Sequence, residues 1–247
     1  MCWISPQLLT QVGIAVSNTS GAVNASTAST TIFLLLGALR RSYIPCSALR
    51  AGKWRGNMRL THDPEGKLLG ILGMGGIGTA FAQRAVPFGM RIQYYNRKPV
   101  SKEKNTVRAQ YVGFEELLRT SDIISIHLPL NNSTRGMIGV REIAMMKPGV
   151  VIINTARGPI VDESALVDAL ETGQVWAAGL DVYEKEPIVH QGLLRNENCV
   201  LMPHVGTATK ETQKKMELLV MENLKMAIIE QKLKTPVSES INVGLGG

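Results

Sequence analysis

Four polar side chains in the second half of the chain have the types that one reaction at a carbonyl group requires. Arg157 lies in the string NTARGPIVDE, Asp181 and Glu186 lie in DVYEKEP, and His204 lies in MPHVG. A hydride added to a carbonyl carbon leaves negative charge on the oxygen, which needs a proton donor and a nearby positive charge. His204 can donate the proton, and Arg157 can bind a substrate carboxylate or the carbonyl itself.

The two carboxylates have separate expected roles. Glu186 beside His204 would hold the imidazole ring and favour its protonated form. Asp181 would accept a hydrogen bond from a nicotinamide amide. Each residue also has an ordinary explanation, because a histidine near a proline is usually structural, an arginine after a strand often forms a surface ion pair, and a glutamate in a K-E-P loop is normally solvated. The presence of all four residues after a phosphate-binding turn favours the functional interpretation.

That turn lies within residues 67–98, KLLGILGMGGIGTAFAQRAVPFGMRIQYYNRK. The uncharged run 68–72 predicts a strand buried on both faces, 79–86 a helix, and 92–95 a second strand. Between them, Gly73, Gly75 and Gly78 have the spacing G-x-G-x-x-G. Such glycines allow a tight turn, close approach of a pyrophosphate and packing of helix on strand, and the amides at the helix start attract phosphate. The motif predicts a dinucleotide site, with a purely structural glycine turn as the alternative.

The end of the second strand indicates which dinucleotide is bound. An NAD site usually places Asp or Glu there to accept from the ribose hydroxyls, but no acid occurs between Thr79 and Lys102. Asn96 takes that position and is followed by Arg97 and Lys98, which can pair with a 2′-phosphate. We therefore expect NADP as the preferred cofactor and NAD as the alternative. The competing explanation is that Arg97 and Lys98 form a solvated loop.

Composition limits the class of protein. The 247 residues suffice for one domain or two, and a 45% hydrophobic and 19% charged chain is typical of globular proteins. The formal charge of +7 is spread along the chain, so we expect an anionic small ligand and no nucleic acid. Three scattered cysteines, Cys2, Cys46 and Cys199, predict reduced thiols and a cytoplasmic location. The longest apolar stretch, 31–39, is too short for a bilayer, so no membrane partner is expected, and we predict no metal site.

The hydrophobic periodicity predicts alternating strands and helices. Expected strands are 13–17, 68–72, 92–95, 122–128, 150–154, 177–181 and 200–202; expected helices are 26–41, 79–86, 114–119, 141–146, 163–172 and 209–233. Residues 42–66 are expected to be a polar connector. This order predicts an α/β fold with a Rossmann-type, doubly wound parallel sheet, in which ligands bind beyond the carboxyl ends of the strands. The apolar face of the last helix is expected to be core: Met216, Leu219, Val220, Met221, Leu224, Ile228 and Ile229. His127 is expected to pack inside or to line the cofactor side.

The strings GILGMGGIG, NTARGPIVDE, GLDVYEKEP and PHVG resemble those of the D-isomer-specific 2-hydroxyacid dehydrogenases. HDPEGKLLGILGMGGIG and the pair Asn96-Arg97 resemble the glyoxylate and hydroxypyruvate reductase branch most. The resemblance implies reduction of a small 2-keto acid with NADH or NADPH, by a homodimer that forms through the cofactor domain. It places the catalytic roles on Arg157, Glu186 and His204, and the nicotinamide contact on Asp181. The other implied cofactor contacts are Gly75, Gly76, Ile77, Arg97, Pro129, Thr134, Thr155 and Ala156.

The resemblance begins at about residue 12, whereas family members begin with a substrate domain that precedes the corresponding segment. On the order of a hundred residues, a small domain, is therefore expected to be missing. We expect residues 1–24 to be a remnant of the substrate domain, 25–205 the dinucleotide-binding domain, and 206–247 a C-terminal helix and tail that return to the substrate domain. Two alternatives to an active dehydrogenase are a nucleotide-binding module that acts through protein contacts and a remnant that does not fold alone.

Overall fold

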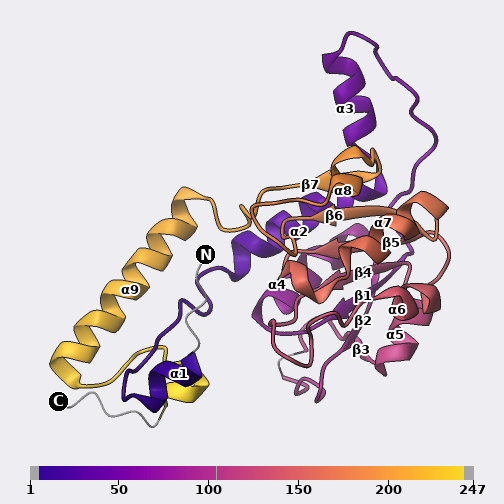
Figure 1. Cartoon of the computed structure of the whole chain (residues 1–247). Helices are drawn as coiled ribbons and strands as arrows, with labels where there is room; N and C mark the ends of the chain where they lie inside the picture. Colours follow the sequence, from indigo (N-terminus) through magenta and orange to yellow (C-terminus); the bar gives the residue numbers. More distant parts are fainter. Residues whose placement is uncertain (1–5, 104, 242–247) are drawn as a thin grey trace. The chain divides into compact units, whose positions relative to one another are not determined.

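A computed structural model of the chain describes residues 6–103 and 105–241 (Figure 1). The chain divides into two compact units, which are described separately. The larger unit is Thr27–Gly206, and the smaller unit combines the segment that ends at Ser26 with the segment that begins at Thr207.

The larger unit is built on a seven-stranded sheet in which every pair of neighbours is parallel. Its strand order is β3-β2-β1-β4-β5-β6-β7, so the order reverses between β1 and β4. The strands are β1 (Leu68–Leu72), β2 (Arg91–Tyr95), β3 (Gln110–Tyr111), β4 (Ile123–Ile126), β5 (Val150–Asn154), β6 (Val175–Leu180) and β7 (Cys199–Leu201). This is the doubly wound arrangement of dinucleotide-binding folds, and it confirms the predicted fold class.

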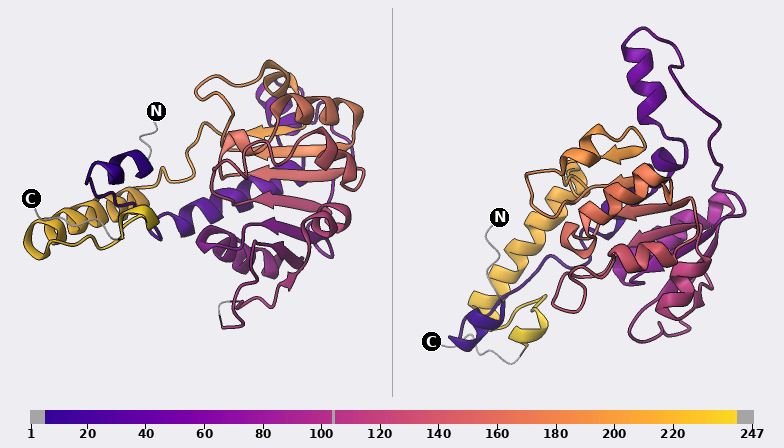
Figure 2. Two further views of the ribbon diagram at one scale, coloured as in Figure 1. Left: turned by 60° about the horizontal axis from the view of Figure 1, so that its bottom comes forward. Right: turned by 45° about the vertical axis from the view of Figure 1, so that its right-hand side comes forward.

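Helices cover both faces of this sheet (Figure 2). One hydrophobic core lies between the sheet and the helices α2 (Asn24–Leu39) and α4 (Gly76–Ala85). The other lies under α5 (Phe114–Thr120), α6 (Val140–Met145), α7 (Glu163–Thr172) and α8 (Gln191–Arg195). In β4, Ile123 belongs to the first core and Ile124 to the second. Burial on both faces explains why these strands are uninterrupted apolar runs in the sequence.

Local signals placed several elements correctly. The Asp162 side chain caps α7 by accepting from the backbone N–H of Ala165 at 3.0 Å, and the helix ends at Gly173, whose φ is 80°. Both residues suit these positions and agree with the predicted helix 163–172, since a short acidic side chain satisfies the first free N–H groups and glycine tolerates the left-handed cap.

The connector 42–66 is more ordered than expected, because it contains the helix α3 (Tyr43–Arg50). This helix buries none of its residues, and its proline, Pro45, lies in the first turn, where a missing N–H costs little. The short elements β3 and α8 also escaped prediction, since so few residues show no period.

The smaller unit consists of α1 (Pro6–Gln11), α9 (Lys210–Glu230) and the 3₁₀ turn Ser238–Ser240. The predicted strand 13–17 is wrong: only Ser17 forms an isolated antiparallel bridge, to Pro236. The expected core face of α9 is also wrong for five of its members, whose exposed fractions run from 52 to 72%: Val220, Met221, Leu224, Ile228 and Ile229. An apolar helix face is stabilised by packing against another surface. The described residues of the smaller unit do not cover this face of α9.

The described residues contain no single helix long and apolar enough to cross a membrane. The pair α2 and α3 meets the length and composition requirements together, but the two helices are bent by 79° at their junction.

Candidate active site

Three neighbouring strands bring the predicted catalytic residues to one edge of the sheet. The last residues of β5 and β6, Asn154 and Leu180, are paired, and Leu180 is paired with Leu201 at the end of β7. Arg157, Asp181 and His204 follow these ends within three residues. The loops that carry them therefore begin side by side at the carboxyl edge, which is where ligands bind in sheets of this kind.

The structure joins Glu186 and His204 directly. His204 Nδ1 lies 2.7 Å from Glu186 Oε2. The other carboxylate oxygen, Oε1, accepts from the backbone N–H of Tyr183 at 3.0 Å. The carboxylate is thus held on both oxygens and orients the imidazole ring. Because Nδ1 faces the carboxylate, Nε2 is the ring nitrogen left to exchange a proton with a substrate.

The backbone at His204 is in a strained conformation, with a φ of 56°. A non-glycine residue adopts this left-handed region only when its surroundings enforce it. Asp181 does so, because its Oδ1 accepts from the N–H of Val205 and its Oδ2 from the N–H of Gly206, each at 2.8 Å. Asp181 is 2% exposed, and burial raises its pKa against the opposing effect of these two N–H groups. The sequence predicts that Asp181 contacts the nicotinamide. The structure shows a further role, since Asp181 also holds the loop after His204 in shape.

Arg157 lies in the neighbouring loop, in a turn shaped by Asn154. The Asn154 side chain accepts from the N–H of Ala156 and donates to the carbonyl of Arg157, both at 3.0 Å. The Arg157 guanidinium donates to the Ala156 carbonyl at 2.6 Å. Sequence reasoning had noted Asn154 only as a strand end, and its role depends on contacts that spacing does not reveal.

The glycine turn joins β1 to α4 at the same edge, and each glycine answers a different need. Gly73 has a φ of 102°, and a Cβ there would lie 2.7 Å from the His127 carbonyl oxygen. A Cβ at Gly78 would overlap the Gly73 carbonyl. A Cβ at Gly75 would meet no atom within 4 Å, and α4 begins without a side-chain cap. The open space at Gly75 and the uncapped helix start fit a pyrophosphate, with Gly76 and Ile77 opening the helix.

Asn96 and its neighbours occupy the end of β2. Asn96 Oδ1 accepts from the backbone N–H of Met74 at 2.8 Å, so this side chain holds the glycine turn; its contact with a ribose stays a prediction. Arg97 and Lys98 are exposed, and neither is in an ion pair with another described residue.

The remaining predicted cofactor contacts follow β4 and β5, and their side chains are engaged within the protein. The Thr134 hydroxyl donates to the Pro129 carbonyl at 2.7 Å and accepts from the N–H of Asn131 at 2.9 Å. Thr155 Oγ1 is 2.9 Å from Thr31 Oγ1, next to the buried Ala156. Contacts from these two segments to a cofactor stay predictions. Because the threonine hydroxyls are already hydrogen-bonded within the protein, we expect backbone groups to make such contacts.

His127 is packed inside, as one of the two sequence interpretations held. Its ring centroid is 5.3 Å from that of Phe81, and Nε2 is 2.9 Å from Ser125 Oγ. Burial lowers the pKa of His127 to about 3, so the ring is neutral at physiological pH.

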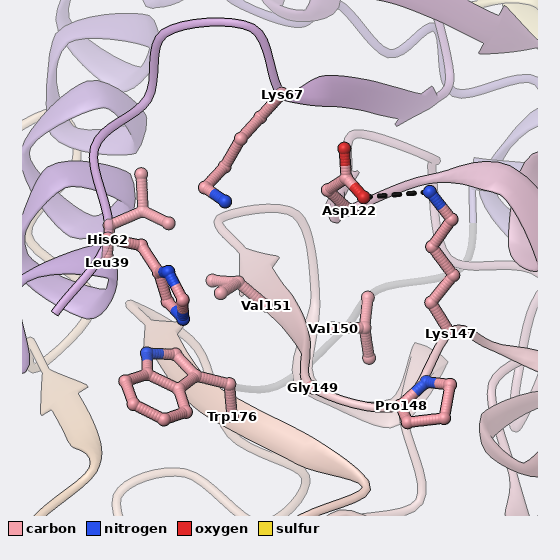
Figure 3. Close-up of a pocket in the computed structure, with 10 residues that line it drawn as sticks. All are labelled: Leu39, His62, Lys67, Asp122, Lys147, Pro148, Gly149, Val150, Val151 and Trp176. Atoms are coloured by element: carbon pink, nitrogen blue, oxygen red, sulfur yellow. Dashed lines mark hydrogen bonds and ion pairs between the residues drawn. The ribbon is translucent and has the colours of Figure 1, made fainter.

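A hollow of about 220 Å³ lies at the opposite, amino edge of the sheet (Figure 3). His62 and Trp176 form one side and Lys67 projects into it, while Asp122 pairs with Lys147 at 2.8 Å on the other side (Figure 3). Its lining contains none of the predicted site residues. The predicted catalytic and cofactor residues therefore lie at the carboxyl edge and not in this hollow.

Comparison with known proteins identifies a family that matches most of the chain. Residues 32–206 match the family model described as "D-isomer specific 2-hydroxyacid dehydrogenase, NAD binding domain". The chain is 57% identical over 234 residues to 4-methyl-2-oxopentanoate reductase A of Aspergillus oryzae, covering 95% of this chain and 71% of that relative. It is 45% identical over 235 residues to glyoxylate reductase 1 of Saccharomyces cerevisiae, covering 93% and 67%.

Two solved structures show the same likeness in three dimensions. A glyoxylate reductase from Paecilomyes thermophila superposes with a TM-score of 0.93 at 56% identity, covering 96% of this chain and 72% of that one. An NADPH-dependent glyoxylate/hydroxypyruvate reductase from Sinorhizobium meliloti, solved with NADP and malonate, has a TM-score of 0.87 at 33% identity, covering 96% and 74%. With the family model, these relatives show that the chain belongs to the D-isomer-specific 2-hydroxyacid dehydrogenases.

Proposed function

We propose that the chain reduces small 2-keto acids to D-2-hydroxy acids with a nicotinamide cofactor. The observation that carries this proposal is the Glu186–His204 pair at 2.7 Å, at the sheet edge that also carries Arg157 and the glycine turn. The names of the relatives, glyoxylate reductase and 4-methyl-2-oxopentanoate reductase, support a 2-keto acid as substrate.

The cofactor, when bound, supplies a hydride to the carbonyl carbon of the substrate. His204 Nε2 donates a proton to the carbonyl oxygen, so that the C=O double bond becomes CH–OH. Glu186 offsets the positive charge of the imidazolium before the transfer and holds the ring in place. Arg157 binds the substrate carboxylate, and Asp181 accepts from the nicotinamide amide. Proton donation by a positioned side chain is worth about 10²- to 10⁴-fold in rate.

We propose NADP as the preferred cofactor. Arg97 and Lys98 are exposed at the end of β2, in positions to bind a 2′-phosphate, and no carboxylate stands there to repel it. Asn96 replaces the usual acid and keeps the glycine turn in place through Met74. The likeness to an NADPH-dependent reductase solved with NADP supports this choice.

We assign the cofactor and catalytic residues to the larger unit, which contains every one of them, and propose that the smaller unit is part of a substrate domain. We further propose a homodimer formed through the cofactor domain. The segment 43–60 supports it, since α3 buries none of its residues and Leu49, Trp54 and Leu60 are 56, 73 and 93% exposed. Light scattering tests this: a single-chain mass at micromolar concentration would contradict it.

A cytosolic location is proposed from the thiols. Cys46 and Cys199 are free, as expected in a reducing compartment. Cys2 lies outside the described residues.

Oxidation of NADPH in the presence of glyoxylate, hydroxypyruvate or 4-methyl-2-oxopentanoate tests the proposed activity. Arg157→Lys keeps the charge but loses the forked donor geometry, so kcat/KM is expected to fall by about 10²-fold. Arg195→Lys, an exposed change at the end of α8, is the matched control and is expected to leave kcat/KM unchanged. Binding of NADPH without turnover of any of these substrates would instead support a nucleotide-binding module.

A further inference from the structure

We propose that Glu163 and Glu184 are positioning residues that lock the loop carrying Arg157 to the loop carrying Glu186. This inference rests on the proposed function, because it concerns how the catalytic groups of that function are aligned. The two loops follow neighbouring strands, β5 and β6, but adjacent strands alone do not fix the long loops that leave them.

The two glutamates form a reciprocal pair, here called the glutamate clasp. The backbone N–H of Glu163 donates to Glu184 Oε1 at 3.2 Å, and the backbone N–H of Glu184 donates to Glu163 Oε1 at 2.7 Å. Each residue therefore gives an N–H to the other and accepts one with its carboxylate. Hydrogen bonds to ionised acceptors are about twice as strong as neutral ones. Two such bonds in opposite directions hold both separation and register.

Burial of the clasp is unequal, because Glu163 is buried and Glu184 is half-buried. Glu163 is 7% exposed and is the first residue of α7, where the helix dipole favours a negative group. Burial raises the pKa of Glu163 and the charge of Glu184 adds to the rise, while backbone N–H groups of Glu184 and His190 oppose it. Two acids placed close together repel, so their retention inside the fold points to a geometric role that backbone donors sustain.

The clasp adjoins the catalytic residues through a backbone contact. A Cβ added at Gly158 would overlap the carbonyl group of Tyr183 and the nitrogen of Glu184, so the two main chains touch there. Gly158 directly follows Arg157, and the N–H of Tyr183 holds Glu186 Oε1 at 3.0 Å. The Tyr183 hydroxyl donates to the Met202 carbonyl at 3.0 Å, two residues before His204.

A continuous line of contacts thus connects all three catalytic side chains. It runs from the Arg157 turn through Gly158 to the Tyr183 backbone, and from there to Glu186 and His204. The glutamate clasp joins the same two loops next to this line of contacts, within one residue of the Gly158 contact. Opening the clasp should therefore shift the Arg157 loop against the Glu186–His204 pair without removing any group that touches substrate.

Glu184→Ala tests the clasp, with Glu184→Gln as the conservative variant, since an amide oxygen still accepts from the N–H of Glu163. Glu171→Ala is the matched control, since Glu171 is an exposed glutamate of α7, the helix that begins at Glu163. We expect kcat to fall about tenfold in Glu184→Ala with the KM for NADPH unchanged, and to stay within about twofold in Glu184→Gln and Glu171→Ala. Full kcat in a folded Glu184→Ala protein would overturn the proposal.

A second readout needs no turnover: the positions of the imidazole NMR signals of His204, recorded at one fixed pH in the chain without cofactor. Glu184→Ala is expected to move these signals, and signals identical to those of the unaltered protein would overturn the clasp. If the unaltered protein turns over no 2-keto acid, the proposed function fails, yet these signals still decide the clasp. Should Glu184→Ala not fold, Glu184→Asp replaces it, because its carboxylate is one methylene shorter and is expected not to reach the N–H of Glu163; unchanged His204 signals would overturn the proposal there too.

Discussion

The two edges of the central sheet use the same kinds of side chain in opposite ways. At the carboxyl edge, Asp181 holds the backbone of the loop after His204, and that loop carries a strained φ of 56°. At the amino edge, Asp122 pairs with Lys147 at 2.8 Å (Figure 3). It also accepts from the N–H of Leu68 at 2.8 Å. The first carboxylate maintains a conformation that the chain would not adopt by itself. The second ties together segments that are already neighbours in the sheet.

This difference predicts where a substitution damages activity and where it damages stability. Strain persists only where the surroundings enforce it, and it concentrates at sites that act on ligands. The carboxyl edge should therefore be sensitive in kcat and the amino edge in the free energy of unfolding. Matched substitutions at the two edges test this division.

The largest expected effect is that of His204→Asn. Asparagine tolerates the left-handed backbone of this position, so the loop should keep its shape while the proton donor is lost. We expect kcat to fall about 10²- to 10⁴-fold, with a melting temperature close to that of the unaltered protein. His62→Asn, at the amino-edge hollow, is the control and should leave kcat unchanged. Comparable losses in the two variants would abolish the distinction between the edges.

Gly158→Ala should act on both quantities, because its added Cβ meets the Tyr183 carbonyl where two functional loops touch. We expect the free energy of unfolding to drop by about 3 kcal/mol, the range for forcing atoms into a packed site, and kcat to fall with it. Gly113→Ala is the control, since a Cβ there meets nothing within 4 Å, and should cost less than about 1 kcal/mol. Urea unfolding measures the free energy of unfolding of the two variants, and NADPH oxidation measures kcat. Equal losses of unfolding free energy would show that the loop contact is not tight.

The two ends of β2 offer a smaller, internally matched test. Arg97 follows the strand at the carboxyl edge and Arg91 begins it at the amino edge, and both are exposed. Arg97→Ala should lower kcat/KM for NADPH about tenfold and leave that for NADH nearly unchanged, as for loss of a charged hydrogen bond to a 2′-phosphate. Arg91→Ala should change neither. Equal effects of Arg97→Ala on the two cofactors would contradict the NADP preference.

Much of the fold was predictable because the signals are local. The uncharged runs Leu68–Leu72 and Val150–Asn154 have the short length typical of a buried strand, and Asp162 with Gly173 marks both ends of α7. The candidate site was equally accessible, since parallel strands place their carboxyl ends together once the alternation is recognised.

Features that depend on contacts between distant segments were not predictable. Nothing near Glu184 in the sequence indicates that its carboxylate meets the N–H of Glu163, twenty-one positions earlier. Asn96 was given to the ribose by position, but its bond to the Met74 backbone becomes visible only when β2 lies beside β1. The apolar stripe of α9 was assigned to a core because periodicity identifies an apolar face but not the surface that covers it.

The smallest expected effect is that of Asp122→Asn at the amino edge. Burial raises the pKa of Asp122, but the N–H of Leu68 and the Lys147 ammonium outweigh it, so the folded-state pKa lies below the unfolded one. Its contribution is therefore present above the unfolded pKa and lost as pH falls through the folded pKa. We expect Asp122→Asn to lose about 1 kcal/mol at neutral pH, in urea unfolding, and the gap to the unaltered protein to close in acid, with kcat unchanged throughout. A gap that widened in acid would reverse the sign, and a loss of kcat would give this edge a part in the reaction that its contacts do not indicate.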